Sequence, residues 1–208
     1  MTRAILERGD KQKLTAVRTC SAAKAPIIAL AEYLDSLTFP ISGGKDIKLR
    51  KVLVMKAQPE EKAEYPCACV FPEGPPDYGE QDGVLMPTYS SDGDVDGGAL
   101  FGCGEVSVPI SVHIWTTEEP HRDNALMMLE DGFNPSHDQL GLILEMPHYH
   151  GIRASFVLSR VQYEDTETDN MHRWRKLILS VKSMCPVARV HMLPRLLPRA
   201  QVEVSSQV

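Results

Sequence analysis

The stretch EVSVPISVHIWTTEEPHRDNALMMLEDGF, residues 105–133, decides the fold of this chain. In its first half apolar residues alternate with mostly polar ones, and this period of two predicts a strand with one buried face. From His121 the period becomes helical, and the predicted helix stops near Gly132. A long strand therefore leads into a short amphipathic helix. The alternating strand residues are Val106, Val108, Ile110, Val112 and Ile114, and the helical ones are Ala125, Leu126, Met128 and Leu129.

The preceding part of the chain predicts one helix and two strands. Residues 25–37 predict a helix, and Pro26 suits its first turn because the missing N–H has no partner there. Residues 52–55 and 65–71 are apolar runs that predict strands, and Pro66 indicates a strand start or a sheet edge. The apolar face of the predicted helix consists of Ile27, Leu30, Ala31, Leu34 and Leu37.

Residues 73–99 are rich in Pro, Gly, Asp and Ser and predict a long inserted loop. Within it, residues 92–97 (DGDVDG) resemble the opening of a calcium-binding EF-hand loop. Cys103 stands at the twelfth position, where that loop needs a bidentate Glu, and flanking helices are missing. We interpret the segment as a solvated acidic loop. The following Gly102-Cys103-Gly104 predicts a turn or a bulge.

The part after the helix predicts a two-stranded antiparallel ribbon. Residues 140–145 form a short apolar segment, either helix or strand, and residues 147–151 form a turn. A strand over 153–163 and a return strand over 171–183 flank the segment 164–170, which we predict to be an acidic hairpin loop.

These elements predict an α+β fold, with a mostly antiparallel β-sheet flanked by two or three helices and with extended terminal arms. We expect an N-terminal arm over 1–20, a single domain over 21–185, and an extended C-terminal arm over 186–208. Pro186, Pro194 and Pro198 forbid a long helix in that last segment. Its apolar residues predict that it lies on another surface, and packing against its own domain is the alternative.

Charge is distributed unevenly along the chain. Residues 1–51 carry ten Lys and Arg against five Asp and Glu, residues 52–170 carry five against twenty-two, and residues 171–208 carry seven against one. Basic ends and an acidic middle suit contact between neighbouring copies, or between ends and middle within one fold. No apolar run reaches about 18 residues, so a transmembrane helix is not expected. The N-terminal residues also lack the apolar core of a signal peptide.

The cysteine and histidine residues do not predict a catalytic or metal centre. The pairs Cys67/Cys69 and His148/His150 lack the usual zinc-ligand spacing, and no nucleophile elbow or phosphate-binding loop occurs. We therefore predict no catalytic, cofactor-binding or metal-binding residues, and a small Cys/His hydrolase or metal enzyme remains the alternative. Five cysteines leave at least one unpaired within the chain. Cys20 and Cys185, near the expected arms, are candidates for inter-chain disulfides, with five free thiols as the other interpretation.

Basic, aromatic and apolar residues near the C-terminus are candidates for a subunit interface, and a plain strand face is the other interpretation of Arg173, Trp174 and Arg175. Nucleic-acid binding by this segment is disfavoured because the middle of the chain is strongly acidic. The candidate interface residues are Arg173, Trp174, Arg175, Arg189, Leu193, Arg195, Leu196, Leu197 and Arg199.

The order of elements resembles the tail-terminator proteins of long-tailed bacteriophages and related neck and tail-completion proteins. The resemblance covers about residues 25–185, and the chain departs from it in the 73–99 loop and the proline-rich end. The residues that carry the resemblance are Ser107–Thr116 followed by His121–Phe133, then Leu144–Gly151, the strand Ala154–Tyr163, the turn Glu164-Asp165 and the strand Trp174–Val181.

This resemblance implies a structural protein with no catalytic residues and no cofactor. It implies a ring, expected to be a hexamer, that caps the tail tube and joins it to the head–tail connector. The expected partners are further copies of the chain and the tube, sheath and connector proteins, and DNA would pass through the ring without specific recognition. The expected location is the virion neck, after assembly in the host cytoplasm. The alternative is another neck component: a head-completion protein, a collar protein or a tail-sheath adaptor.

Overall fold

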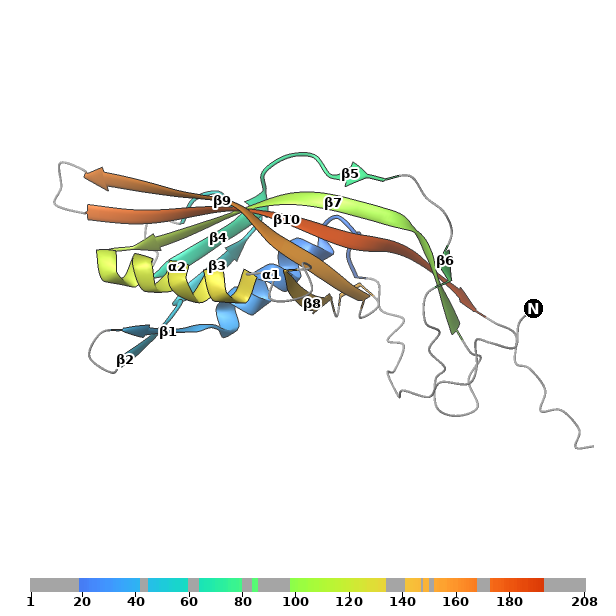
Figure 1. Ribbon diagram of the computed structural model, residues 1–208, viewed down its shortest axis with the longest axis horizontal. Coiled ribbons are helices and arrows are strands. Elements are labelled where there is room, and N and C mark those ends of the chain that lie inside the picture. The colour runs from blue at the N-terminus through green and yellow to red at the C-terminus, as the bar shows by residue number, and fades with distance from the viewer. Residues whose placement is uncertain are drawn as a thin grey trace, which may run out of the picture.

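The computed structural model describes residues 19–41, 45–59, 64–79, 84–85, 98–133, 141–146, 148–149, 152–167 and 173–192 (Figure 1). In chain order the elements are α1 (Ala25–Ser36), β1 (Thr38–Ile41), β2 (Lys45–Lys48), β3 (Lys51–Val54), β4 (Cys67–Pro72), β5 (Asp77–Tyr78), β6 (Val84–Leu85), β7 (Gly98–Thr116), α2 (Glu119–Phe133), β8 (Leu142–Met146), β9 (Ile152–Glu167) and β10 (Arg173–Met192).

The main sheet has the strand order β3-β4-β7-β10-β9-β8, and the short strands β5 and β6 also pair with β7. All of its pairings are antiparallel except that of β3 with β4. The strands β1 and β2 form a separate hairpin that the sequence analysis did not predict. The predicted α+β fold with a mostly antiparallel sheet is confirmed. No helix in the described ranges is long and apolar enough to cross a membrane.

Both helices pack on one face of the main sheet, which we call the inner face. The period of two along β7 directs Val108, Ile110 and Ile114 to this side, where each is at most 1% exposed. Leu30 of α1 and Leu129 of α2 are fully buried in the same apolar cluster. Burial of a large apolar side chain contributes on the order of 1.5–3 kcal/mol, so this cluster holds the helices to the sheet.

The predicted helices are confirmed with small shifts at their ends. Helix α1 has a proline in its first turn, as expected, and it ends at Ser36 because Leu37 adopts an extended conformation. Helix α2 begins at Glu119, two residues before the predicted start. The hydroxyl of Thr116 donates to the carbonyl oxygen of Glu118, which ties the end of β7 to the start of α2.

The prediction of one unbroken loop over residues 73–99 is wrong in part. Strands β5 and β6 lie within it, and β7 begins at Gly98, so β7 is much longer than predicted. The predicted turn or bulge around Cys103 is a bulge, because the register with β10 skips this residue. Gly104 has φ 141°, a backbone conformation that residues with a Cβ rarely adopt. Residues 92–97 lie outside the described residues.

The acidic segment predicted as a hairpin loop is strand over Glu164–Glu167. Its carboxylates face cationic residues on β10, since Glu164 is opposite Lys176 and Asp165 is opposite Arg175. Cross-strand pairs of opposite charge stabilise a ladder and extend it beyond the apolar alternation. The short apolar segment near residue 143, helix or strand in the sequence analysis, is the edge strand β8.

The predicted boundary of the C-terminal arm at residue 186 is also wrong. Strand β10 continues to Met192 and pairs with the first part of β7 in the same chain. The ladder from β10 to β9 ends at Met184, so Pro186 lies where β10 has β7 as its only neighbour in the described sheet. Figure 1 shows β7 and β10 running together past β8 and β9 as a projecting ribbon. Residues 193–208 and 1–18 of the expected arms lie outside the described residues.

Candidate functional site

The outer face of the sheet, opposite the helices, carries a partly buried cluster of aromatic and charged side chains. The ammonium of Lys176 lies 4.8 Å from the centroid of the Trp115 ring and 2.8 Å from a carboxylate oxygen of Glu164. The His113 ring meets the Phe71 ring edge to face at 4.8 Å between centroids. The alternation of β4, β7 and β10 places these side chains on one side, so the cluster is a direct consequence of strand register.

Two polar atoms in this cluster are buried without a partner in the described part of the chain: Nδ1 of His113 and Nε1 of Trp115. Burial is the main reason that the pKa of His113 is lowered, and nearby Lys176 lowers it further. The imidazole is therefore neutral near pH 7. The hydrogen bond from Lys176 is the main reason that the pKa of Glu164 is lowered. The outer-face cluster thus combines one internal ion pair with a neutral histidine.

A second charged network fixes α2 against the ends of β9 and β10. Asp165 accepts hydrogen bonds from two guanidinium groups, that of Arg122 at 2.9 Å and that of Arg175 at 2.6 Å. Arg122 also donates to Asp123 and Glu119, and its guanidinium carbon lies 4.6 Å from the Tyr163 ring centroid. Arg175, a predicted interface residue, is therefore engaged inside its own chain.

For the other predicted interface residues the structure describes only the backbone, or does not describe the residue. Arg173 and Trp174 begin β10, and Arg189 lies on the projecting part of β10 opposite Phe101, but their side chains lie outside the described structure. The structure also leaves undescribed the remaining five predicted residues, which are Leu193, Arg195, Leu196, Leu197 and Arg199.

The cysteines do not support an inter-chain disulfide at Cys185. Cys185 is a free thiol and is fully buried, with its Sγ 3.9 Å from Sδ of Met146. A neighbouring chain cannot reach this sulfur while the core is intact, so the prediction is wrong for Cys185. Cys20 is half-buried and its Sγ lies 3.6 Å from the carbonyl oxygen of His148.

Burial also makes three of these thiols poor nucleophiles. It raises the pKa of Cys67 to about 12, of Cys69 to about 11 and of Cys185 to about 12. The thiolate is the reactive form of cysteine, and it is scarce near neutral pH at such values. Among the described residues, no group of three or more His, Cys, Asp or Glu side chains is placed to hold a metal ion.

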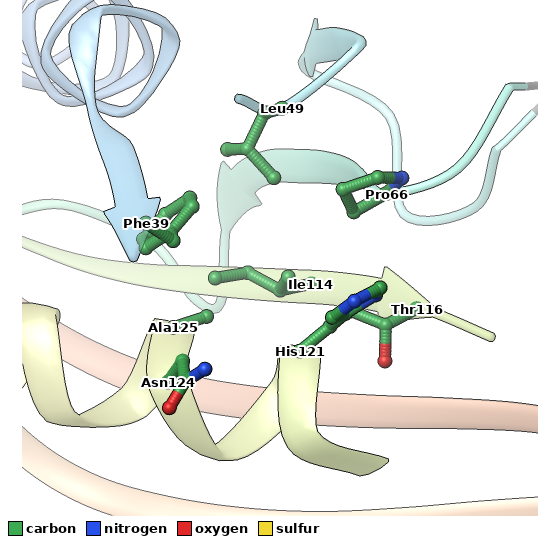
Figure 2. A pocket seen from close by; sticks show the side chains of 8 residues that line it. All are labelled: Phe39, Leu49, Pro66, Ile114, Thr116, His121, Asn124 and Ala125. Carbon is green, nitrogen blue, oxygen red and sulfur yellow. The ribbon is translucent and has the colours of Figure 1, made fainter. Parts of the chain in front are cut away.

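A small apolar pit and a polar groove lie next to each other where β7 meets α2. Figure 2 shows the pit between Phe39 of β1, Ile114 of β7 and Ala125 of α2, with His121 at one side. Its volume of about 10 Å³ is close to that of a single water site. The groove has a volume of about 490 Å³, and its lining residues are Asp46, Lys48, Leu49, Arg50, Tyr65, Pro66, Thr117, Glu118 and His121.

Charged side chains at this groove form ion pairs with each other or with neighbouring residues. Nε2 of His121 lies 3.3 Å from a carboxylate oxygen of Glu118, and Arg50 lies 3.5 Å from Glu64. The lining contains both signs of charge and the hydroxyl residue Thr117, but neither Ser nor Cys. A His–Glu pair without an adjacent Ser or Cys lacks the arrangement that activates these usual nucleophiles.

The part of the outer face that lies toward β8 contains none of the predicted interface residues. There the exposed apolar residues Ile143, Val157 and Met184 come from three neighbouring strands. Each of the three residues occupies an outward position of its strand, and the period of two along each strand indicates such positions. The sequence predicts the pairing of β9 with β10, but it does not specify that β8 pairs with β9, which places Ile143 beside the other two residues.

No protein-family description and no curated protein matches this chain.

Proposed function

We propose that the chain is a structural subunit of the neck of a long-tailed bacteriophage, a tail terminator that forms a ring at the end of the tail tube. The observation that carries the proposal is the order of elements. A first helix and short strands precede the long strand β7, which leads directly into α2, and the strands β8, β9 and β10 follow. This order is the one that resembles the tail-terminator proteins.

The surfaces of the domain support an assembly role. The β7–β10 ribbon projects beyond the body of the sheet, and a projecting ribbon can reach a neighbouring subunit (Figure 1). Large apolar side chains are exposed on the outer face, where they suit a protein partner. The raised pKa values of Cys67, Cys69 and Cys185 disfavour the alternative of a cysteine-dependent hydrolase.

Native mass spectrometry of the purified chain tests the ring. The expected species is a closed oligomer with the mass of six 23.1 kDa subunits, seen as a ring by negative-stain imaging. A chain that stays monomeric at the protein concentrations of an assembling particle, in the presence of tail tubes, would contradict the proposal. A ring that binds the sheath or a head protein, and not the end of the tube, would favour another neck component.

We propose that the C-terminal segment clamps the next subunit or the next ring. The truncation that tests this proposal begins at residue 193, because residues 186–192 belong to β10. Deletion of residues 193–208 leaves every described strand intact, so the chain is expected to fold and to assemble poorly. Circular dichroism measures the folding and size-exclusion chromatography measures the assembly. Full assembly of the shortened chain would show that the segment is dispensable.

A further inference from the structure

The outer face has an uncovered area toward β8 that differs in character from the Trp115–Lys176 cluster. One row across the sheet brings together Met184 of β10, Ser155 of β9 and Ile143 of β8, and the next places Val157 beside Lys182. Ile143 is 48% exposed, Met184 38% and Val157 37%. Both helices pack on the inner face, so they leave this area open.

Three cationic side chains of β9 and β10 lie on the same face as these apolar residues. Arg153, Arg160 and Lys182 are exposed, and none of them forms a salt bridge with another described residue. Acidic residues also lie near these rows. Glu145 of β8 is opposite Arg153, and Glu73 accepts a hydrogen bond from Ser180, which is opposite Arg160. Asp77 of β5 pairs with Ser107, the β7 partner of Met184. We call Ile143, Val157 and Met184 with Arg153, Arg160 and Lys182 the outer sheet patch.

Helix α2 presents the complementary surface on the other side of the molecule. Its buried residues Arg122, Ala125, Leu129 and Phe133 face the sheet. Helical spacing then directs Asp123, Met127, Glu130 and Asp131 to the opposite side, where all four are exposed. Met127 is 52% exposed, and neither Glu130 nor Asp131 forms a salt bridge within the described ranges. We call these four residues the α2 acidic ridge.

We propose that the α2 acidic ridge of one copy docks on the outer sheet patch of the next copy. Both surfaces have an apolar centre, and the charged residues that define the patch are cationic whereas those that define the ridge are anionic, which favours this pairing and opposes ridge-to-ridge or patch-to-patch contact. The two surfaces lie on opposite faces of one protomer. Each copy therefore uses both at once, and such head-to-tail contacts close into a ring when the rotation per subunit permits. The inference rests on the proposed ring and names the surfaces that form it.

Two charge-reversed variants test the docking. The patch variant carries Arg160→Glu and Lys182→Glu, and the ridge variant carries Glu130→Lys and Asp131→Lys. All four positions are exposed, so each variant is expected to fold, which circular dichroism checks. Each variant alone places like charges against each other at every interface. It is therefore expected not to form the ring that is expected for the unmodified chain.

Mixing the two variants in equal amounts restores opposite charges at every interface. The acidic patch of one variant meets the basic ridge of the other, and the basic patch meets the acidic ridge, in strict alternation around an even-numbered ring. Native mass spectrometry is expected to show mixed rings with equal numbers of each variant. Matched reversals on β2, Asp46→Lys and Lys48→Glu, change exposed charges outside both surfaces and are expected to leave the ring intact.

The outcomes separate the docking from the proposed function. Rings formed by both variants on their own, or the absence of rings from the folded mixture, would overturn the docking while the ring of the unmodified chain stands. An unmodified chain that never forms rings would overturn the docking and the proposed function together.

Discussion

Arg122 and Asp165 join α2 to the end of β9, with 2.9 Å between Nη1 of Arg122 and Oδ1 of Asp165. The Arg122 side chain is 9% exposed, and the other oxygen of Asp165 bonds to Arg175. One carboxylate therefore fixes a helix and two strands relative to one another, although it lies in a segment whose composition is that of a loop.

Asp165→Asn is expected to destabilise the fold by about 1–2 kcal/mol. Hydrogen bonds to charged groups contribute about 1.5–3 kcal/mol, and the value is reduced here because solvent reaches the Asp165 side chain. Urea unfolding measures the change. Asp77→Asn, on the exposed strand β5, is the matched control and is expected to leave stability unchanged. Equal effects of the two substitutions would contradict a bridging role for Asp165.

Gly141→Ala is expected to be strongly destabilising. Gly141 has φ +69°, and a Cβ built there would lie 2.2 Å from the carbonyl oxygen of Phe156. The left-handed conformation alone costs a residue with a Cβ about 1–2 kcal/mol, and the collision with backbone adds to it. At Gly74 a Cβ would meet only Cγ of Pro109, at 3.5 Å, so Gly74→Ala is the control. Thermal unfolding temperatures for the two variants should differ clearly, and equal temperatures would argue against the strain at Gly141.

The lowered pKa of His113 predicts a loss of stability on acidification. Burial, followed by the nearby Lys176, depresses the pKa below its ordinary value of 6.5 in the folded chain. As the pH falls below 6.5 the unfolded chain binds the proton first. The contribution of the neutral His113 to the free energy of unfolding is therefore complete above pH 6.5, and it decreases as the pH falls toward the pKa of His113 in the folded chain.

The measurement is urea unfolding of the unmodified chain and His113→Gln between pH 8 and pH 5. The substitution also removes the contact with Phe71, which lowers stability at every pH. The expected result is a stability difference between the two chains that changes with pH below 6.5. A difference that stays constant across the range would show that His113 does not titrate differently on folding.

The burial of the cysteines predicts two classes of thiol reactivity. Cys20 and Cys103 are half-buried, whereas Cys67, Cys69 and Cys185 are buried. Iodoacetamide is expected to modify the first two in the native chain and all five after unfolding, as read by peptide mass spectrometry. Rapid native modification of Cys185, or a dimer linked through it on a non-reducing gel, would contradict its place in the core.

The sequence by itself determined the elements whose side chains repeat with a clear period. The alternation from Val106 to Ile114 specifies a strand with one buried face, and the helical spacing of Ile27, Leu30 and Leu34 specifies α1. These signals are local because burial on one face depends only on the spacing of residues along the chain. They were sufficient for the α+β fold class and for the order of the main elements.

Only the tertiary structure decided where the strands end and which outward residues become neighbours. Glu164–Glu167 extend β9 because Arg175 and Lys176 lie across from them, and residues 186–192 extend β10 because the first part of β7 pairs with them. The outer sheet patch likewise forms because β8, β9 and β10 pair in one register, which brings Ile143, Val157 and Met184 together. The spacing of residues within one segment specifies which face of a strand is buried, but for segments distant in the sequence it does not specify which strand becomes the neighbour.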